Sequence, residues 1–245
     1  AEHFRDEYHI IAPDLRGHGD SQWMEGGTYT QLDYVYDIAQ LLHQKDMRPV
    51  TIIGHSLGGS ISLLYTSVYP DNVKKLVAIE GLGPSPSMQE KLMEKSIGER
   101  IRDWMADLRK SSGRSARRYP TLEDAFQRMQ DENPHLSEAQ ARHLTVHGSN
   151  QNEDGTFSWK FDNYVRFFAF SDLPRNDLKK LWGDIKCPTL LVRGVESWAS
   201  DPVADGRTEH FNCPIEVEAF EKAGHWVHHD QLEGFVQRVR TFLAD

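Results

Sequence analysis

Apolar and polar positions along the first 83 residues alternate between two patterns. Short apolar runs at Val50–Ile53 and Lys75–Ile79 predict buried strands, and Tyr8–Ala12 predicts an earlier one. Residues 31–44 instead carry apolar side chains at helical spacing, and Thr30 before them is a suitable N-cap. This alternation of apolar strands with helices predicts a parallel sheet that is covered by helices on both faces.

The pattern changes after Pro84, where strand-like runs mostly disappear. A stripe of apolar residues at helical spacing runs from Ser87 to Lys110, Thr121 begins a capping-box sequence, and Ser137 starts a further helix. The polar residues 150–155 predict a turn. We therefore expect three segments: residues 1–83 as the first part of an α/β core, residues 84–182 as an inserted helical cap, and residues 183–245 as the second part of the core.

A serine motif, Gly54-His55-Ser56-Leu57-Gly58, stands between the strand Val50–Ile53 and a helical stretch. A serine on a sharp strand-to-helix turn is held in strained backbone geometry with its hydroxyl exposed. Gly54 and Gly58 are expected to leave room where a Cβ would clash. The Leu57 amide, at the helix N-terminus, is expected to point at a developing oxyanion. The pattern favours Ser56 as a nucleophile over an idle serine in a glycine-rich turn.

A histidine near the end of the chain is the best candidate for a general base. Ala223-Gly224-His225-Trp226 follows the alternating run 214–220 and precedes the last helical stretch, for which Asp230 fits an N-cap. A histidine on a loop after a late strand can reach the serine, and imidazole suits proton transfer at neutral pH. His225 with His228, His229 and Asp230 also resembles a metal site, but neighbours in sequence rarely converge on one ion. We expect neither a metal nor a cofactor.

Three blocks of sequence resemble the α/β-hydrolase fold family with a helical cap: residues 13–21 (Pro-Asp-Leu-Arg-Gly-His-Gly-Asp-Ser), 54–59 and 223–226. They span most of the chain and occur in the order of that family. The resemblance implies an α/β-hydrolase fold, with a mostly parallel, doubly wound sheet, an inserted helical cap, Ser56 as nucleophile and His225 as base. In the family, two or three strands and the loop with the second oxyanion donor come earlier, so we expect these N-terminal strands to be missing from this chain.

The acid of the triad is expected between the serine and the histidine in sequence. After residues 188–194 the family commonly has Gly-x-x-Asp, but this chain has Gly194-Val195-Glu196-Ser197, with serine at the aspartate position. Glu80, at the end of the strand before the cap, stands where some relatives, including many haloalkane dehalogenases, keep a catalytic glutamate. We favour Glu80, with Glu196 and Asp201 as alternatives. For each of these three residues the alternative without a catalytic role is a carboxylate that is solvated or that caps a helix.

These residues predict a serine hydrolase of the carboxylesterase type, which acts on a small to medium ester through an acyl-enzyme on Ser56. Serine at position 56 argues against the haloalkane dehalogenase and epoxide hydrolase reactions, which use a carboxylate there. C–C bond hydrolysis and perhydrolysis on the same fold stay open, as does a ligand-binding protein without catalysis. The predicted substrate contacts are His55, Trp104, Phe168 and Trp226.

The composition of the chain argues against nucleic acids and membranes as binding partners. The formal net charge of −9 argues against a nucleic-acid-binding surface, and no run of 18 apolar residues predicts a membrane span. Cys187 and Cys213, the two cysteines, are expected to be free thiols in a reducing compartment, which favours the cytoplasm. A small-molecule substrate is the expected partner, and the oligomeric state stays open.

Overall fold

The computed structural model describes the chain except residues 26–28, 113–115, 168–169, 171–172, 174 and 245. The described residues fall into two compact units. One combines Ala1–Tyr29 with Gly98–Phe170, and the other combines Thr30–Ile97 with Ser171–Asp245. The division of the chain into core and cap at residues 83 and 182, which the sequence suggests, stays a prediction.

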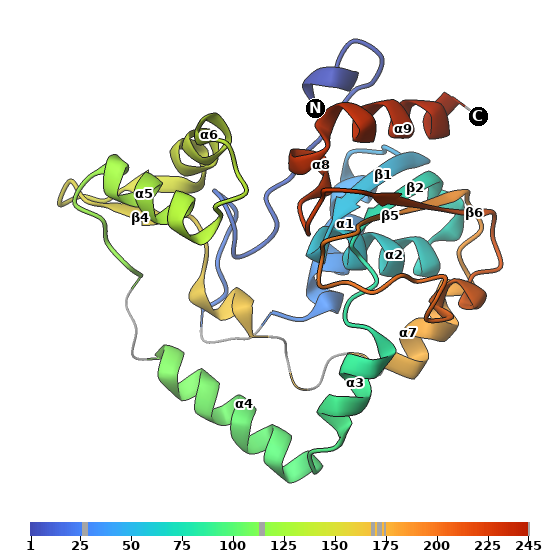
Figure 1. Cartoon of the computed structure of the whole chain (residues 1–245), viewed down its shortest axis with the longest axis horizontal. Helices are drawn as coiled ribbons and strands as arrows, with labels where there is room; N and C mark the ends of the chain where they lie inside the picture. The colour runs from blue at the N-terminus through green and yellow to red at the C-terminus, as the bar shows by residue number, and fades with distance from the viewer. Residues whose placement is uncertain (26–28, 113–115, 168–169, 171–172, 174, 245) are drawn as a thin grey trace. The chain divides into compact units, whose positions relative to one another are not determined.

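The second unit contains the predicted parallel sheet (Figure 1). Its strands, in spatial order, are β1 (Val50–His55), β2 (Val73–Ile79), β5 (Thr189–Gly194) and β6 (Ile215–Phe220), and each adjacent pair is parallel. Leu76, Val77 and Leu190 on the inner strands are fully buried. Strands that are covered on both faces explain why their sequences are apolar without a break.

Helices lie on both sides of this sheet: α1 (Gln31–Gln44) and α2 (Leu57–Val68) on one side, α9 (Leu232–Ala244) on the other (Figure 1). α1 has the predicted limits, and it begins at Gln31 because Thr30 and Asp33 form a reciprocal capping box there. α2 packs against β1 and β2, which buries every residue from Ile61 to Ser67. The unit also contains α3 (Pro86–Met93), α7 (Arg175–Trp182), α8 (Val227–Asp230), and the 3₁₀ helices Pro70–Asn72 and Arg207–His210.

The register of the strands brings three chain segments to one edge of the sheet. His55 at the end of β1 is paired with Ile79 at the end of β2, and Ile79 is paired with Val192 of β5. The residues that follow these strands therefore leave the sheet side by side. In open parallel sheets this carboxyl edge is where ligands bind.

The Gly98–Phe170 part of the first unit contains several α-helices, as predicted for the middle of the chain. Thr121 and Ser137 are the N-caps of α5 (Leu122–Glu132) and α6 (Glu138–Gly148), each within a capping box. Two short strands, β3 (Ser149–Gln151) and β4 (Phe157–Trp159), pair in antiparallel fashion. The predicted turn at 150–155 is correct only in part, because its first two residues belong to β3 and the turn that joins the strands begins at Asn152. The remaining elements are α4 (Ile97–Ser112) and the 3₁₀ helices Glu2–Phe4 and Asn163–Arg166.

Two predicted elements differ from the structure. Tyr8–Ala12 is not a strand, because no strand among the described residues pairs with its backbone. Its side chains at Tyr8, Ile10 and Ile11 are exposed, so its apolar sequence is not that of a buried strand. The continuous helical stripe from Ser87 to Lys110 is divided between α3 and α4, with the break at residues 94–96.

The two cysteines are free thiols, as predicted. Burial raises the pKa of Cys187 to about 11 and also raises the pKa of Cys213. Both therefore stay protonated near neutral pH, which makes them poor nucleophiles. Among the described helices, none combines the length and the apolar character needed to cross a membrane. The cytoplasmic location stays a prediction.

Candidate active site

Ser56 lies on the sharp turn between β1 and α2. Its backbone has φ of 52° and ψ of −114°, a conformation that non-glycine residues rarely adopt and that is found mainly at functional sites. The turn is fixed by a hydrogen bond from the Ser56 N–H to the carbonyl of Ile79, at 2.8 Å. The strain predicted for this serine is therefore present.

The glycines of the motif do not all act as predicted. A Cβ on Gly54 would lie 2.4 Å from the carbonyl oxygen of Gly58, so Gly54 is needed for space. The expectation for Gly58 is wrong, because a Cβ there would meet nothing within 4 Å. Gly59 takes that role, since its Cβ would lie 2.8 Å from the Cα of Gly81. Helix α2 can approach the end of β2 closely only because both residues are glycines.

His225 is on the loop between β6 and α8, and two hydrogen bonds hold this loop. The ring Nε2 of His55 donates to the carbonyl oxygen of His225 at 2.7 Å. The Gly224 N–H donates to the carboxylate of Asp230 at 2.8 Å. Asp230, expected as the N-cap of the last helix, instead ends α8 and anchors the histidine loop.

Ser56, His225 and Glu80 are joined by hydrogen bonds although they are far apart in sequence. Nε2 of His225 accepts from the Ser56 hydroxyl at 2.9 Å, and Nδ1 of His225 donates to Oε2 of Glu80 at 3.1 Å. The side chain of Glu80 is fully buried, whereas that of His225 is 23% exposed. A neutral histidine with its proton on Nδ1 has its lone pair on Nε2, which is the arrangement that accepts a proton from serine.

Glu80 directly follows β2 and has φ of 52°. Its Oε1 accepts from the Gly194 N–H at 2.8 Å, and its Oε2 accepts from the Ser197 hydroxyl at 2.6 Å as well as from His225. A buried carboxylate needs such donors to offset the loss of water. Gly194 and Ser197 both belong to the end of β5 and the turn after it, so the neighbouring strand supplies them.

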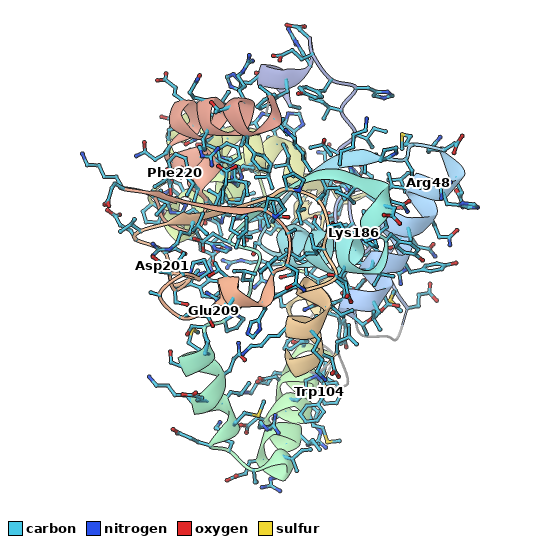
Figure 2. The ribbon with its side chains drawn as sticks, turned by 90° about the vertical axis from the view of Figure 1, so that its right-hand side faces the viewer. Arg48, Trp104, Lys186, Asp201, Glu209 and Phe220 are labelled. Carbon is cyan, nitrogen blue, oxygen red and sulfur yellow. The ribbon has the colours of Figure 1, made fainter. Side chains whose placement is uncertain are left out.

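The alternative acids Glu196 and Asp201 have other surroundings. Glu196 is exposed, and its backbone N–H donates to the carbonyl of Ala223. Asp201, labelled in Figure 2, lies 3.7 Å from the guanidinium of Arg193 and accepts from the Val203 N–H at 2.9 Å. Of the three predicted carboxylates, Glu80 is the one at hydrogen-bonding distance from the ring of His225.

A buried arginine, which sequence reasoning missed, fixes the segments after β2 and β5. Arg207 is 2% exposed and forms an ion pair with Asp205 at 2.9 Å. Its guanidinium also donates to the carbonyl oxygens of Gly83 and Ser200, each at 3.1 Å. These segments directly follow Glu80 and Ser197, so Arg207 joins the two segments that lead away from this hydrogen-bonded pair.

Two further imidazoles pack around His225. The ring centroid of His55 lies 4.8 Å from that of His225 and 4.7 Å from that of His228. Burial lowers the pKa of His55, and burial together with the neighbouring histidines lowers the pKa of His228 to about 3. Both rings are therefore neutral at pH 7, and a charge that forms on His225 meets no second cation in them. Among the described residues, no cluster of three or more His, Cys, Asp or Glu side chains is arranged to hold a metal ion.

The remaining predicted site residues lie in different places. Leu57 is the first residue of α2, so its N–H is one of the groups that a helix leaves unpaired. Trp226 is at the start of α8 with its ring centroid 5.3 Å from that of His229, and the half-exposed Trp198 lies equally close to the ring of His225. Trp104 is on α4 of the other unit and contacts Phe170. Phe168 lies outside the described residues.

Known proteins resemble this chain over nearly its whole length. Residues 1–232 match the family model of the alpha/beta hydrolase fold. A 2-hydroxy-6-oxo-2,4-heptadienoate hydrolase of Pseudomonas putida is 26% identical over 96% of this chain and 78% of its own length. An esterase of Mycobacterium tuberculosis is 27% identical over 95% of this chain and 74% of its own. A solved thioesterase domain from the curacin biosynthetic pathway has a TM-score of 0.80 at 24% identity, over 97% of this chain and 83% of its own length. At this identity the similarity shows a shared fold alone.

Proposed function

The chain belongs to the α/β hydrolase fold family, and we propose that it is a serine hydrolase that cleaves small to medium carboxylic esters through an acyl-enzyme on Ser56. The observation that carries this proposal is the series of hydrogen bonds from Ser56 through His225 to the buried Glu80. A serine becomes nucleophilic when a base takes its proton and a third group orients that base. Proteins named as an esterase and as a hydrolase among the relatives support the same reaction class.

In the first half of the reaction, Oγ of Ser56 attacks the ester carbonyl carbon while Nε2 of His225 takes the hydroxyl proton. Glu80 keeps the ring oriented through Nδ1 and stabilises the imidazolium without taking the proton. The N–H of Leu57 donates to the oxyanion of the tetrahedral intermediate. His225 then returns the proton to the leaving alcohol, and the acyl group stays on Ser56.

In the second half, a water molecule attacks the acyl carbon while His225 takes a proton from it. Collapse of the second tetrahedral intermediate frees the acid and returns the proton to Oγ of Ser56. The rings of His55 and His228, which pack around His225, stay neutral because their pKa values are lowered. Of these three imidazoles, His225 is therefore the one that becomes charged at each step. This arrangement avoids repulsion between neighbouring imidazolium ions.

A second reaction of the same residues is attack on a ketone followed by C–C bond cleavage. The relative from Pseudomonas putida, whose name gives a 6-oxo dienoate as its substrate, favours keeping this reaction as an alternative. The two reactions share the serine, the histidine and the acid, and they differ in the leaving group. Parallel assays with esters and with a vinylogous 1,5-diketone acid would separate them.

The proposal is tested with p-nitrophenyl acetate, butyrate and octanoate together with a fluorophosphonate probe. We expect ester hydrolysis and labelling of the wild-type chain, and loss of both in Ser56→Ala. Ser67→Ala is a matched control, because Ser67 is a buried serine of the same helix whose hydroxyl donates to the Leu63 carbonyl. Turnover that survives in Ser56→Ala would exclude this serine as the nucleophile. A wild-type chain that neither turns over nor reacts would favour a ligand-binding protein.

A further inference from the structure

The hydroxyl of Ser197 has a defined direction. Its oxygen accepts from the N–H of Ala199 at 3.2 Å, and its proton points to Oε2 of Glu80 at 2.6 Å. A serine hydroxyl has a single proton to donate, so this proton is committed to the carboxylate. The distance lies in the short range that is typical of a hydroxyl bound to a carboxylate.

Ser197 and His225 donate to the same oxygen of Glu80, while Gly194 donates to the other. A glutamate has three rotatable side-chain bonds, and Oε2 must be placed correctly for the ring of His225 to keep its proton on Nδ1. Gly194 alone would fix one oxygen and leave the carboxylate free to turn about it. The second donor, Ser197, fixes the plane of the group.

We propose that Ser197 is a positioning residue, which acts through Glu80 to hold the base His225 in the orientation that accepts the proton of Ser56. Its hydroxyl comes from the turn that follows β5 and reaches Glu80, which follows the adjacent strand β2. The next residue, Trp198, places its ring 5.3 Å from that of His225, so a single turn contacts both the acid and the base. The role of Ser197 in turnover rests on the function proposed above.

The decisive experiment is a double-mutant cycle between position 197 and position 80. We expect Ser197→Ala to lower kcat for p-nitrophenyl butyrate about tenfold with KM within about twofold, because one hydrogen bond that orients the base is lost. Ser197→Thr keeps a hydroxyl and should recover most of the rate. In a Glu80→Gln background, Ser197→Ala should have no further effect, because its route to His225 is already broken. Ser67→Ala, in which another buried hydroxyl is removed, should match the wild type.

Two kinetic results would overturn the inference. One is a kcat of Ser197→Ala within about twofold of the wild type. The other is an equal loss of kcat from Ser197→Ala in the wild-type and Glu80→Gln backgrounds. Additive losses would mean that Ser197 does not act through Glu80, as expected if the substitution causes a general structural defect.

A measurement that needs no turnover separates this inference from the proposed function. The proton on Nδ1 of His225 should give a downfield resonance in NMR spectra of the wild-type chain and of Ser197→Thr, and this resonance should shift or vanish in Ser197→Ala. An unchanged resonance in Ser197→Ala would show that Ser197 does not hold Glu80 against the ring. If the wild type shows neither hydrolysis nor labelling, the proposed function fails, and this resonance still decides the role of Ser197.

Discussion

The ring of His55 donates a hydrogen bond from Nε2 to the backbone carbonyl of His225 at 2.7 Å. The two residues are 170 positions apart in sequence. His55 directly precedes Ser56, and His225 is hydrogen-bonded to the Ser56 hydroxyl. His55 is predicted from the sequence as a substrate contact, but its donor nitrogen binds the loop that carries His225. Because burial lowers its pKa, this ring stays neutral at pH 7.

Replacing His55 should therefore change turnover more than substrate binding. We expect His55→Leu to lower kcat about tenfold with KM within about twofold, since the carbonyl of His225 loses its donor and the loop is less well held. His55→Gln keeps an N–H donor and should retain most of the activity. Steady-state kinetics with p-nitrophenyl butyrate would check this. A large rise in KM for both variants with kcat unchanged would instead support the role of substrate contact.

The low pKa of His228 predicts that the fold loses stability in mild acid. Its pKa is about 3 in the folded chain, against about 6.5 for an unfolded histidine. Between these values the unfolded chain binds one proton more than the folded chain, so the free energy of unfolding falls as the pH falls. The contribution from this group is a loss of about 2 kcal/mol between pH 7 and pH 5.

Urea denaturation at the two pH values would measure this loss. We expect His228→Gln to lose about 2 kcal/mol less than the wild type between pH 7 and pH 5. His43→Gln is the control, because His43 is an exposed histidine on α1 of the same unit. Equal losses in His228→Gln and the wild type would contradict the prediction.

The three candidate acids make a clear kinetic prediction. Glu80→Gln should lower kcat by about 10⁴-fold, the size of loss that follows when the acid of a serine triad becomes an amide and the histidine tautomer is wrong. Glu196→Gln and Asp201→Asn should stay within about threefold of the wild type, because one carboxylate is exposed and the other pairs with Arg193. Rates of ester hydrolysis at saturating substrate would check all three. A comparable loss in Asp201→Asn would move the acid away from Glu80.

The sequence predicts the scaffold of the site well because the signals there are local. The strand–serine–helix turn around Ser56 and the capping box at Thr30 each depend on residues that are close in sequence. Local spacing also places Glu80 at a strand end. It does not show which carboxylate contacts His225. Because β2 and β5 are neighbours whose ends lie at the same edge of the sheet, a carboxylate after either strand is a candidate.

The details that the sequence missed all depend on contacts between distant residues. Ser197 is noticeable in the sequence only as a departure from a family pattern, and its bond to Glu80 spans 117 residues. Asp230 has the residue type of a helix cap, but the amide that it binds is that of Gly224 in the histidine loop. The spacing of glycines likewise cannot tell which one faces another backbone: the sequence predicts this for Gly58, whereas it is Gly59 that lies against Gly81.

That difference between adjacent glycines predicts opposite effects of two alanine substitutions. In Gly58→Ala the new methyl group meets no atom within 4 Å, and alanine is favoured over glycine in a helix by up to about 1 kcal/mol. In Gly59→Ala the methyl group would lie 2.8 Å from the Cα of Gly81, so backbone must move. Such overpacking typically costs about 1–3 kcal/mol.

Thermal and urea denaturation of the two variants would test this pair. We expect Gly58→Ala to be at least as stable as the wild type and Gly59→Ala to be less stable. Because Gly81 directly follows Glu80, the displaced backbone should also move Glu80, so Gly59→Ala should lose turnover even at temperatures where it is fully folded. If Gly59→Ala keeps both the stability and the kcat of the wild type, the close approach of α2 to the end of β2 does not control the position of Glu80.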